Sequence, residues 1–490
     1  MDIFRTKSVE QSIRDTEAPE HQLRKRLTAV DLTVFGIGVI VGTGIFVLTG
    51  QVARDVAGPA VAISFVVAGI VCGLAALCYA EFASTIPVAG SAYTFSFATL
   101  GEFPAWVIGW DLILELALAA AVVSVGWSGY FASLLASLGF ELPASIAGED
   151  PVVNVPAVVI VALLTAVLVA GIKLSSQVNL ILVITKIAVV LLVIFAGLFF
   201  IDSANYTPFI PDPISTPRVE GLQAPLVQVL FGIQPVAFGV IGIFSAAAIV
   251  FFAFIGFDIV ATAAEETIEP QRDVPRGIIG SLAICTLLYV GVSLVVVGMQ
   301  KYSSLSEAAP LSDAFISVGQ AWLATIISVG AIAGLTTVVL VLLLGQARVL
   351  FAMCRDGLLP RRLAVVHPRF GTPARLTVLI GVVTMALAGF VSFGELAELV
   401  NIGTLFAFVL VSVGVIILRR TRPDLPRGFR TPLMPVLPIL SVLACLYLML
   451  NLPVQTWLRF LVWMLIGIVL YFAYGYRHSR TAAPWQASEE

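Results

Sequence analysis

Glycine is concentrated in residues 30–55 in a way that predicts an interrupted helix. It stands at positions 36, 38, 42, 44 and 50, in a stretch long enough for one bilayer crossing at ~1.5 Å per residue. A glycine inside a helix costs about 1 kcal/mol relative to alanine, and non-helical backbone persists at membrane depth only beside protein or a wet cavity. We therefore expect a break from Val41 to Gly44, with a second half-helix beginning near Gly44 or Ile45.

A half-helix that begins at mid-membrane has the chemistry of an anion site. Its first N–H groups are free, and the positive end of its dipole points into the cavity. The alternative is that the glycines only let helices pack closely, as small residues do in many membrane helices. This segment alone leaves both interpretations open.

A second stretch repeats the pattern. Residues 243–267 form an apolar run that carries Ile255-Gly256-Phe257-Asp258 near its middle. Two interrupted helices at matching positions of inverted halves are typical of secondary transporters that bind substrate near the midplane. The recurrence therefore favours a binding cavity over simple packing.

Lys186 lies about eleven residues into the apolar run 175–201, close to the expected midplane. An ammonium at this depth needs polar partners or must lose its proton. One interpretation is that Lys186 changes protonation during a transport cycle. The alternative is a permanently charged, structural lysine bonded to backbone carbonyls.

Two carboxylates lie in the run 103–138. Asp111 and Glu115 are four residues apart and so share one helix face. Carboxylates inside a membrane are rare, so each is a candidate for function. We expect Asp111 at the interface, whereas Glu115 either faces the cavity or makes a helix–helix hydrogen bond.

The elements that must position these residues are membrane helices. The chain has 490 residues, of which 59% are hydrophobic and 12% charged, and its mean hydropathy is +1.03. These values predict an all-α integral membrane protein with one helical bundle. Twelve apolar runs are expected to cross the bilayer: 30–53, 58–83, 103–138, 155–171, 175–201, 243–267, 274–299, 320–353, 374–391, 396–418, 433–452 and 456–476.

The positive residues predict the orientation. A cytoplasmic N-terminus places all but five of the 27 lysines and arginines on the cytoplasmic side. We expect a cytoplasmic arm at 1–29 and a cytoplasmic tail at 477–490. We also expect an extracellular loop at 202–242 and no removable signal peptide. The exceptions are Arg54, Arg218, Lys301 and Arg459, with Lys186 inside the membrane.

Other site chemistries find little support. The cysteines lie in spans or at a helix end, and the three histidines lie in segments expected to be cytoplasmic. We therefore expect neither a structural disulfide nor a metal site. A net charge of −3 gives no reason to expect nucleic acid as a partner.

The two breaks divide the chain into two halves. The first break opens the block 30–201 and the second opens the block 243–418, each with five spans, while 433–476 holds spans eleven and twelve. Because five is odd, the second block has the opposite membrane orientation to the first. The sequence thus predicts a five-plus-five inverted repeat with discontinuous first and sixth helices.

Several stretches resemble a known family. The chain from about residue 27 to 476 resembles the amino acid, polyamine and organocation (APC) transporter superfamily, and most closely a bacterial member of its cationic amino acid transporter (CAT) subgroup. The stretches that carry the resemblance are GIGVIVGTGIFVLTG, LCYAEFASTIPVAGSAYTFSF, GWDLILE, FFAFIGFDIVATAAEETIEPQRDVPRGI and GQARVLFAMCRDGLLP.

The resemblance implies a LeuT-like fold with alternating access and a binding site for an amino acid. By similarity, Thr43 and Gly44 offer donors to the substrate carboxylate. The carbonyls of Ile40, Phe252 and Ile255 accept from its amine. These roles agree with the anion site expected from the glycines.

The same resemblance places three further residues. Glu115 would lie near the distal part of the site, and Leu342 would line the end that receives the substrate side chain. Lys186 matches a lysine that, in proton-coupled relatives, stands where sodium sits in sodium-coupled ones. The insertion at 211–241 departs from shorter relatives and leaves the shape of the outer mouth open. An apolar Leu342 disfavours a site optimised for a cationic side chain.

The sequence therefore predicts a permease of a bacterial inner membrane that imports L-α-amino acids by proton symport. A small neutral substrate such as alanine is expected, the proton is the coupling ion, and no other cofactor is needed. The alternatives are an amino acid exchanger or uptake of cationic amino acids. A membrane enzyme would need catalytic or metal-ligand clusters, and a receptor would need a large soluble segment, so both are disfavoured. We expect a monomer in the lipid bilayer and leave open whether a single-span partner binds it.

Overall fold

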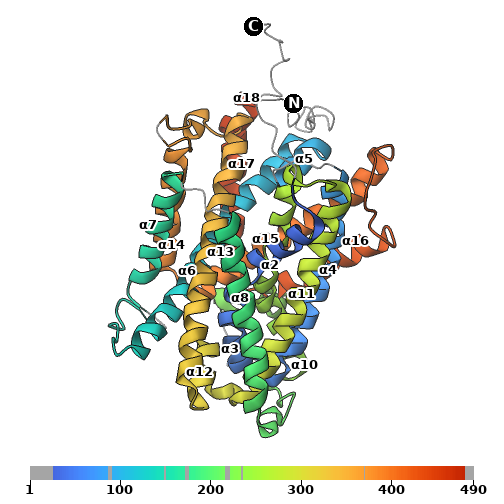
Figure 1. Cartoon of the computed structure of the whole chain (residues 1–490). Helices are drawn as coiled ribbons and strands as arrows, with labels where there is room; N and C mark the ends of the chain where they lie inside the picture. Colours follow the sequence, from blue (N-terminus) through green and yellow to red (C-terminus); the bar gives the residue numbers. More distant parts are fainter. Residues whose placement is uncertain are drawn as a thin grey trace.

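The computed structural model describes residues 26–85, 91–147, 151–171, 176–215, 221–232, 236–368 and 370–479. These residues form a bundle of long helices (Figure 1). The expected cytoplasmic arm up to residue 25 and the end of the expected tail from residue 480 lie outside the described residues.

The helices have the length and composition of membrane spans. Within the described residues, eight are long and apolar enough to cross a bilayer, and four shorter apolar helices accompany them. Each of the twelve apolar runs contains a helix, although the count of twelve crossings stays a prediction. Large apolar side chains such as Phe199, Leu287 and Leu465 are exposed on the outside of the bundle. In water such a surface would favour aggregation, whereas lipid tails cover it without cost. The chain is a multi-pass membrane protein.

The first part of the chain runs through the first interruption to the fifth expected span. Its elements are α2 (Ala29–Ile40), η1 (Gly44–Leu48), α3 (Thr49–Val52), η2 (Ala53–Ala57), η3 (Gly58–Ala60), α4 (Val61–Thr85), α5 (Ser91–Thr99), α6 (Glu102–Ser137), α7 (Val155–Val169), α8 (Ser176–Gly197) and η4 (Leu198–Phe200).

The connection to the second interruption contains a short helix and a small ribbon. Its elements are η5 (Ser203–Tyr206), β1 (Ile214–Ser215), η6 (Gly221–Gln223), α9 (Leu226–Phe231) and β2 (Val236–Ala237). The two strands pair antiparallel. With only six residues, α9 is too short to span a bilayer.

The remainder carries the second interruption and the last helices. Its elements are α10 (Gly239–Val250), η7 (Phe251–Phe254), η8 (Phe257–Glu266), α11 (Pro270–Met299), η9 (Tyr302–Ser304), α12 (Pro310–Ser317), α13 (Ala321–Arg355), η10 (Arg361–Ala364), α14 (Ala374–Phe390), α15 (Phe393–Thr421), α16 (Val436–Leu450), α17 (Val454–Leu470), η11 (Tyr471–Gly475) and α18 (Tyr476–His478).

The interrupted helices lie inside the bundle. In Figure 1, α7 and α14 form one edge and α16 another, while α2 lies between α11 and α13, and α10 packs against α4. The side chains of both interruptions are buried almost throughout. Helix α6 packs along α13, and α4 packs along α11. These two pairs of long helices form the walls around the interrupted elements.

Candidate functional site

The first interruption lies where the glycines predict it. Helix α2 begins at a capping box in which Thr28 and Asp31 satisfy each other's backbone N–H groups, and it ends at Ile40. Val41 is extended, with ψ of 90°. Helical hydrogen bonding resumes at Ile45, whose N–H donates to the carbonyl of Gly42 at 3.3 Å. The prediction of a break from Val41 to Gly44 is confirmed.

The second interruption also lies at the predicted glycine. Helix α10 ends at Val250, a 3₁₀ turn follows, and Ile255 is extended with ψ of 139°. Gly256 has φ of +113°, which L side chains rarely adopt. A Cβ atom there would also lie 2.7 Å from a methyl group of Val39. Gly256 is therefore required both by the turn and by the close approach of the first interrupted helix.

The two interruptions touch each other at a second glycine. A Cβ atom on Gly44 would overlap the Cα and Cβ atoms of Ala253. The hydroxyl of Tyr289, on α11, lies 2.7 Å from the carbonyl oxygen of Ile40 and 2.6 Å from that of Ala253. One side chain thus connects the end of α2 with the turn η7.

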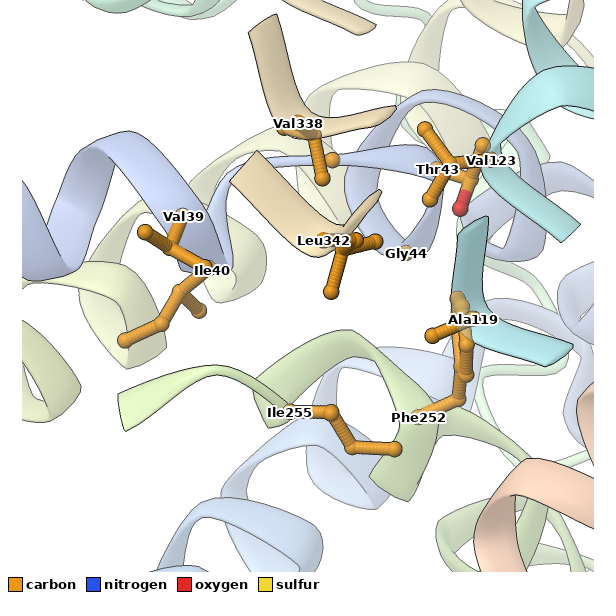
Figure 2. A pocket seen from close by; sticks show the side chains of 11 residues that line it. Val39, Ile40, Thr43, Gly44, Ala119, Val123, Phe252, Ile255, Val338 and Leu342 are labelled. Atoms are coloured by element: carbon orange, nitrogen blue, oxygen red, sulfur yellow. The ribbon is translucent and has the colours of Figure 1, made fainter. Parts of the chain in front are cut away.

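A small cavity lies between the interruptions. Its free volume is about 20 Å³, close to the room that one water molecule needs. An amino acid is larger, so the surrounding side chains must move apart to admit it. Figure 2 shows Phe252 and Ile255 facing Leu342 across this cavity. The lining residues are Val39, Ile40, Gly42, Thr43, Gly44, Ala119, Val123, Phe252, Ile255, Val338 and Leu342.

The cavity brings together six of the seven residues expected to bind substrate: Ile40, Thr43, Gly44, Phe252, Ile255 and Leu342. Its surface is almost entirely hydrocarbon. Thr43 contributes the side-chain hydroxyl, which is buried and has no hydrogen-bond partner among the residues that the structure describes. A buried polar group without a partner is costly, so the cavity favours a ligand that hydrogen-bonds at Thr43.

Glu115 is the expected binding residue that does not line the cavity. It lies on α6 four residues before the lining residue Ala119, one helical turn away. Its carboxyl group is close to Thr404 and Asp258. Asp111, four residues earlier on α6, is completely buried beside Gly403. The helix face that carries Asp111 and Glu115 therefore packs against α15 and η8, beside the cavity and not in its wall.

Lys186 lies at the first interruption. It is completely buried, and its ammonium donates to the carbonyls of Gly38 and Val41, the latter at 3.3 Å. Both carbonyls belong to the C-terminal end of α2, where the helix dipole is negative. Small residues make room for this side chain, since a Cβ atom on Gly334 of α13 would lie 3.0 Å from the Cβ atom of Lys186.

The hydroxyls of Thr336 and Thr337 on α13 bond to carbonyls of their own helix. Thr336 donates to Ile332 in its own helix and accepts from the indole of Trp127. Thr337 donates to Gly334, also in α13. The glycine at 334 brings the lysine stem against the helix backbone, and both hydroxyls satisfy carbonyls of their own helix.

Two polar residues at the interruptions were missed by sequence reasoning. Tyr289 bonds carbonyls of both interrupted helices. Asn401 of α15 is buried, and its amide donates to the carbonyls of Ala248 and Ile249 at 3.1 and 3.3 Å. A polar side chain in the middle of an apolar run was the available signal, because such a group needs a partner.

Comparison with known proteins identifies the family. The amino acid permease family model matches residues 27–473. A branched-chain amino acid permease of Bacillus subtilis is 50% identical over 98% of this chain and 98% of its own length. A methylthioribose transporter of the same organism is 46% identical over 97% of this chain and 98% of its own length. A vacuolar cationic amino acid transporter of Arabidopsis thaliana is 39% identical over 82% of this chain and 65% of its own length.

These relatives are named as permeases and transporters, so the chain is not an enzyme. The family match extends over both interrupted helices and the cavity between them. The chain belongs to the amino acid permeases of the APC superfamily, as the sequence motifs predict.

Proposed function

We propose that this protein imports neutral, apolar L-α-amino acids by proton symport. The observation that carries the proposal is the cavity in which both interruptions meet, with hydrocarbon walls and an unpartnered hydroxyl at Thr43. An α-amino acid has a fixed polar end and a variable side chain. The interrupted backbone suits the polar end, and the hydrocarbon walls suit the side chain.

The polar end of the substrate would lie across the two interruptions. The backbone at Thr43 and Gly44 begins the second half of the first helix, where N–H groups and the dipole favour a carboxylate. The carbonyls of Ile40, Phe252 and Ile255 would accept from the ammonium. All five residues line the cavity.

The side-chain end would be apolar. Leu342, Val338 and Val123 are among the residues that give the cavity hydrocarbon walls, and a cationic side chain placed against them would lose its hydration without a close partner. The 50% identical relative is named a branched-chain amino acid permease. We propose leucine, isoleucine and valine as substrates, with alanine, the substrate expected from the sequence, also accepted.

A second candidate substrate is methylthioribose, the substrate in the name of the 46% identical relative. A ribose ring carries several hydroxyls that need hydrogen-bond partners when buried. Among the residues that line this cavity, Thr43 supplies the polar side chain. The cavity therefore favours an amino acid over a sugar.

The transport cycle would use the architecture expected from the sequence. We propose twelve crossings, with inverted repeats at 30–201 and 243–418 and the last two helices at 433–476. Both termini would be cytoplasmic, in the inner membrane of a bacterium, and the working unit would be a monomer with no requirement for a single-span partner. The positions of the two interruptions, at the start of each proposed repeat, support this arrangement.

Proton coupling would act through Lys186. Its ammonium holds two carbonyls at the end of α2, and loss of the proton would weaken both hydrogen bonds. The first interruption would then be easier to rearrange. Protonation would thus bias the equilibrium between outward-open and inward-open states.

The test is transport into liposomes that contain the purified protein. Labelled leucine, valine, alanine, arginine and methylthioribose are offered with and without an imposed pH gradient. We expect gradient-driven accumulation of the apolar amino acids and little uptake of arginine or methylthioribose. Flux that needs amino acid on the far side but no gradient would identify an exchanger instead. Uptake of methylthioribose above leucine would contradict the proposed substrate.

Leu342 offers a variant for the same assay. Leu342→Ser removes hydrocarbon from the cavity wall, and we expect the ratio of arginine to leucine uptake to rise by about tenfold. Leu342→Met keeps the volume and the apolar character, so the ratio should change little. An unchanged ratio in Leu342→Ser would show that the side-chain end of the substrate lies elsewhere.

A further inference from the structure

Three oxygen atoms lie close together where the interrupted helices meet. The hydroxyl oxygen of Tyr289 is 2.7 Å from the carbonyl oxygen of Ile40 and 2.6 Å from that of Ala253. All three residues are buried. Both distances are those of a short O–H···O hydrogen bond.

A phenol has one hydrogen to donate. It can point to Ile40 or to Ala253, and the other carbonyl then faces the hydroxyl oxygen with no hydrogen between them. Two acceptors at such a distance repel each other, and a buried carbonyl without a donor is costly. The three oxygens therefore lack one hydrogen.

The carbonyl of Ile40 belongs to a residue that lines the cavity. A donor that enters the cavity can supply the missing hydrogen there, and the tyrosine proton can then remain on Ala253. An ammonium group carries three N–H donors and a positive charge. An ammonium group is therefore a better donor to the carbonyl of Ile40 than a neutral hydroxyl is.

We propose that Tyr289 is a positioning residue for the ammonium group of the substrate. It holds the carbonyl of Ile40 towards the cavity, and ammonium binding moves its hydrogen fully to the carbonyl of Ala253. Ammonium binding thus strengthens the hydrogen bond from Tyr289 of α11 to Ala253 of η7, the residue that Gly44 contacts. This inference rests on the proposed function, because it requires a substrate with a free α-amine.

The hydroxyl of Tyr289 can be removed by a substitution that keeps the ring. The ring of Tyr289 packs against Phe65 and Phe254, with centroids 5.5 and 5.1 Å away. Tyr289→Phe keeps these contacts and deletes one oxygen. Tyr289→Met, which is also apolar and of similar length, serves as a second variant should the first fail to fold.

Tyr130 provides a matched control. It is also a buried tyrosine, and its hydroxyl donates to the carbonyl of Phe46 at 2.6 Å, in the second half of the same interrupted helix. Phe46 does not line the cavity. Tyr130→Phe therefore measures the general effect of losing a hydroxyl that holds this helix.

The experiment measures binding of three ligands to purified parent and variants by calorimetry. Leucine carries both polar groups, leucine methyl ester keeps the ammonium without the carboxylate, and isocaproate keeps the carboxylate without the ammonium. In Tyr289→Phe we expect leucine and its ester to bind about tenfold more weakly, while isocaproate changes by less than about threefold. Tyr130→Phe should affect the three ligands equally.

Two outcomes overturn the inference. One is an equal loss for isocaproate and leucine in Tyr289→Phe, which would make the hydroxyl a general structural contact. The other is unchanged leucine binding in that variant. A parent protein that binds neither leucine nor its ester would instead contradict the proposed function, so the two failures are distinguishable.

Discussion

Two carbonyls at the end of α2 accept hydrogen bonds from the ammonium of Lys186, whereas two at the end of α10 accept from the side-chain amide of Asn401. Both donors come from a helix outside the interrupted pair, α8 in the first case and α15 in the second. An interruption leaves carbonyls without helical partners, and each partner helix supplies one donor group. The donors differ in that the first can lose its proton and the second cannot.

The backbone conformation also differs between the two interruptions. The first interruption has an extended Val41 and glycines with negative φ, whereas the second is fixed by Gly256 in a left-handed conformation against Val39. Apart from Tyr289, which bonds both interruptions, the second is held by the left-handed glycine and a neutral amide, and the first by a group that can lose its proton. If protons drive transport, we expect protonation to change the conformation of the first interruption and to leave that of the second unchanged.

The largest effect is expected where the two interruptions touch. Gly44→Val would place side-chain atoms on the backbone of Ala253 and separate the two halves of the site. We expect leucine binding to weaken by about 100-fold, since overpacking of a close backbone contact costs up to about 3 kcal/mol. Calorimetry on the purified variant, with its thermal stability as the measure of folding, provides the test.

Gly42→Ala is the matched control for that variant. A Cβ atom on Gly42 would lie 3.7 Å from a methyl group of Val338, an ordinary van der Waals distance. Binding should therefore change by less than about threefold. Equal losses in both variants would mean that the loop is sensitive as a whole and that contact with Ala253 is not the cause.

The next effect concerns the titratable donor. Lys186→Met keeps an apolar chain of similar length but cannot be charged, so we expect accumulation driven by a pH gradient to disappear while leucine exchange continues. A gradient of one pH unit corresponds to about 1.4 kcal/mol, or tenfold accumulation for one coupled proton. The concentration ratio reached in liposomes at several internal and external pH values measures this directly.

Accumulation that persists in Lys186→Met would exclude the lysine as the coupling group. A strict sodium requirement in the parent would contradict the proposal as well, because the proposed coupling ion is the proton. Cys285 on α11 lies near Lys186. Cys285→Ser in the parent background should therefore leave the accumulation ratio unchanged, which separates the thiol from the lysine.

The interruptions could be predicted from sequence because their causes are local. Glycine at 44 and 256 marks the places where a Cβ atom would collide, and a lysine at mid-span must find acceptors. The apolar run at 274–299 marks the span but misses the start of α11. The helix begins at Pro270, before the run, because proline suits the first turn of a helix.

The partners of the interruptions could not be predicted in the same way. Tyr289 and Ile40 are 249 residues apart in sequence, and no local pattern shows which carbonyl a tyrosine reaches. Val123 and Val338 line the cavity but are ordinary apolar residues of apolar helices. Glu115 lies one turn from the cavity, and the sequence could not decide between a cavity position and a contact with another helix, because helical periodicity gives a face and not the depth along it.

The smallest effect is expected at the neutral donor. Asn401→Ala removes the amide from the carbonyls of Ala248 and Ile249, and we expect the free energy of unfolding to fall by about 1 to 3 kcal/mol. The dependence of accumulation on the pH gradient should remain that of the parent. Thermal unfolding in detergent and the liposome ratio measure the two quantities separately.

Asn401→Asp turns the comparison into a direct test. A protonated carboxyl can donate to one of the two carbonyls, whereas a carboxylate has no hydrogen to donate and repels both oxygens. The second interruption would then respond to protons, as the first does in the parent. We expect Asn401→Asp to be less stable than Asn401→Ala at neutral pH and to regain stability as the pH falls, because only the protonated form restores a hydrogen bond. Parallel stability curves for the two variants from acid to neutral pH would show that Asn401 does not hold the second interruption through its donor hydrogen.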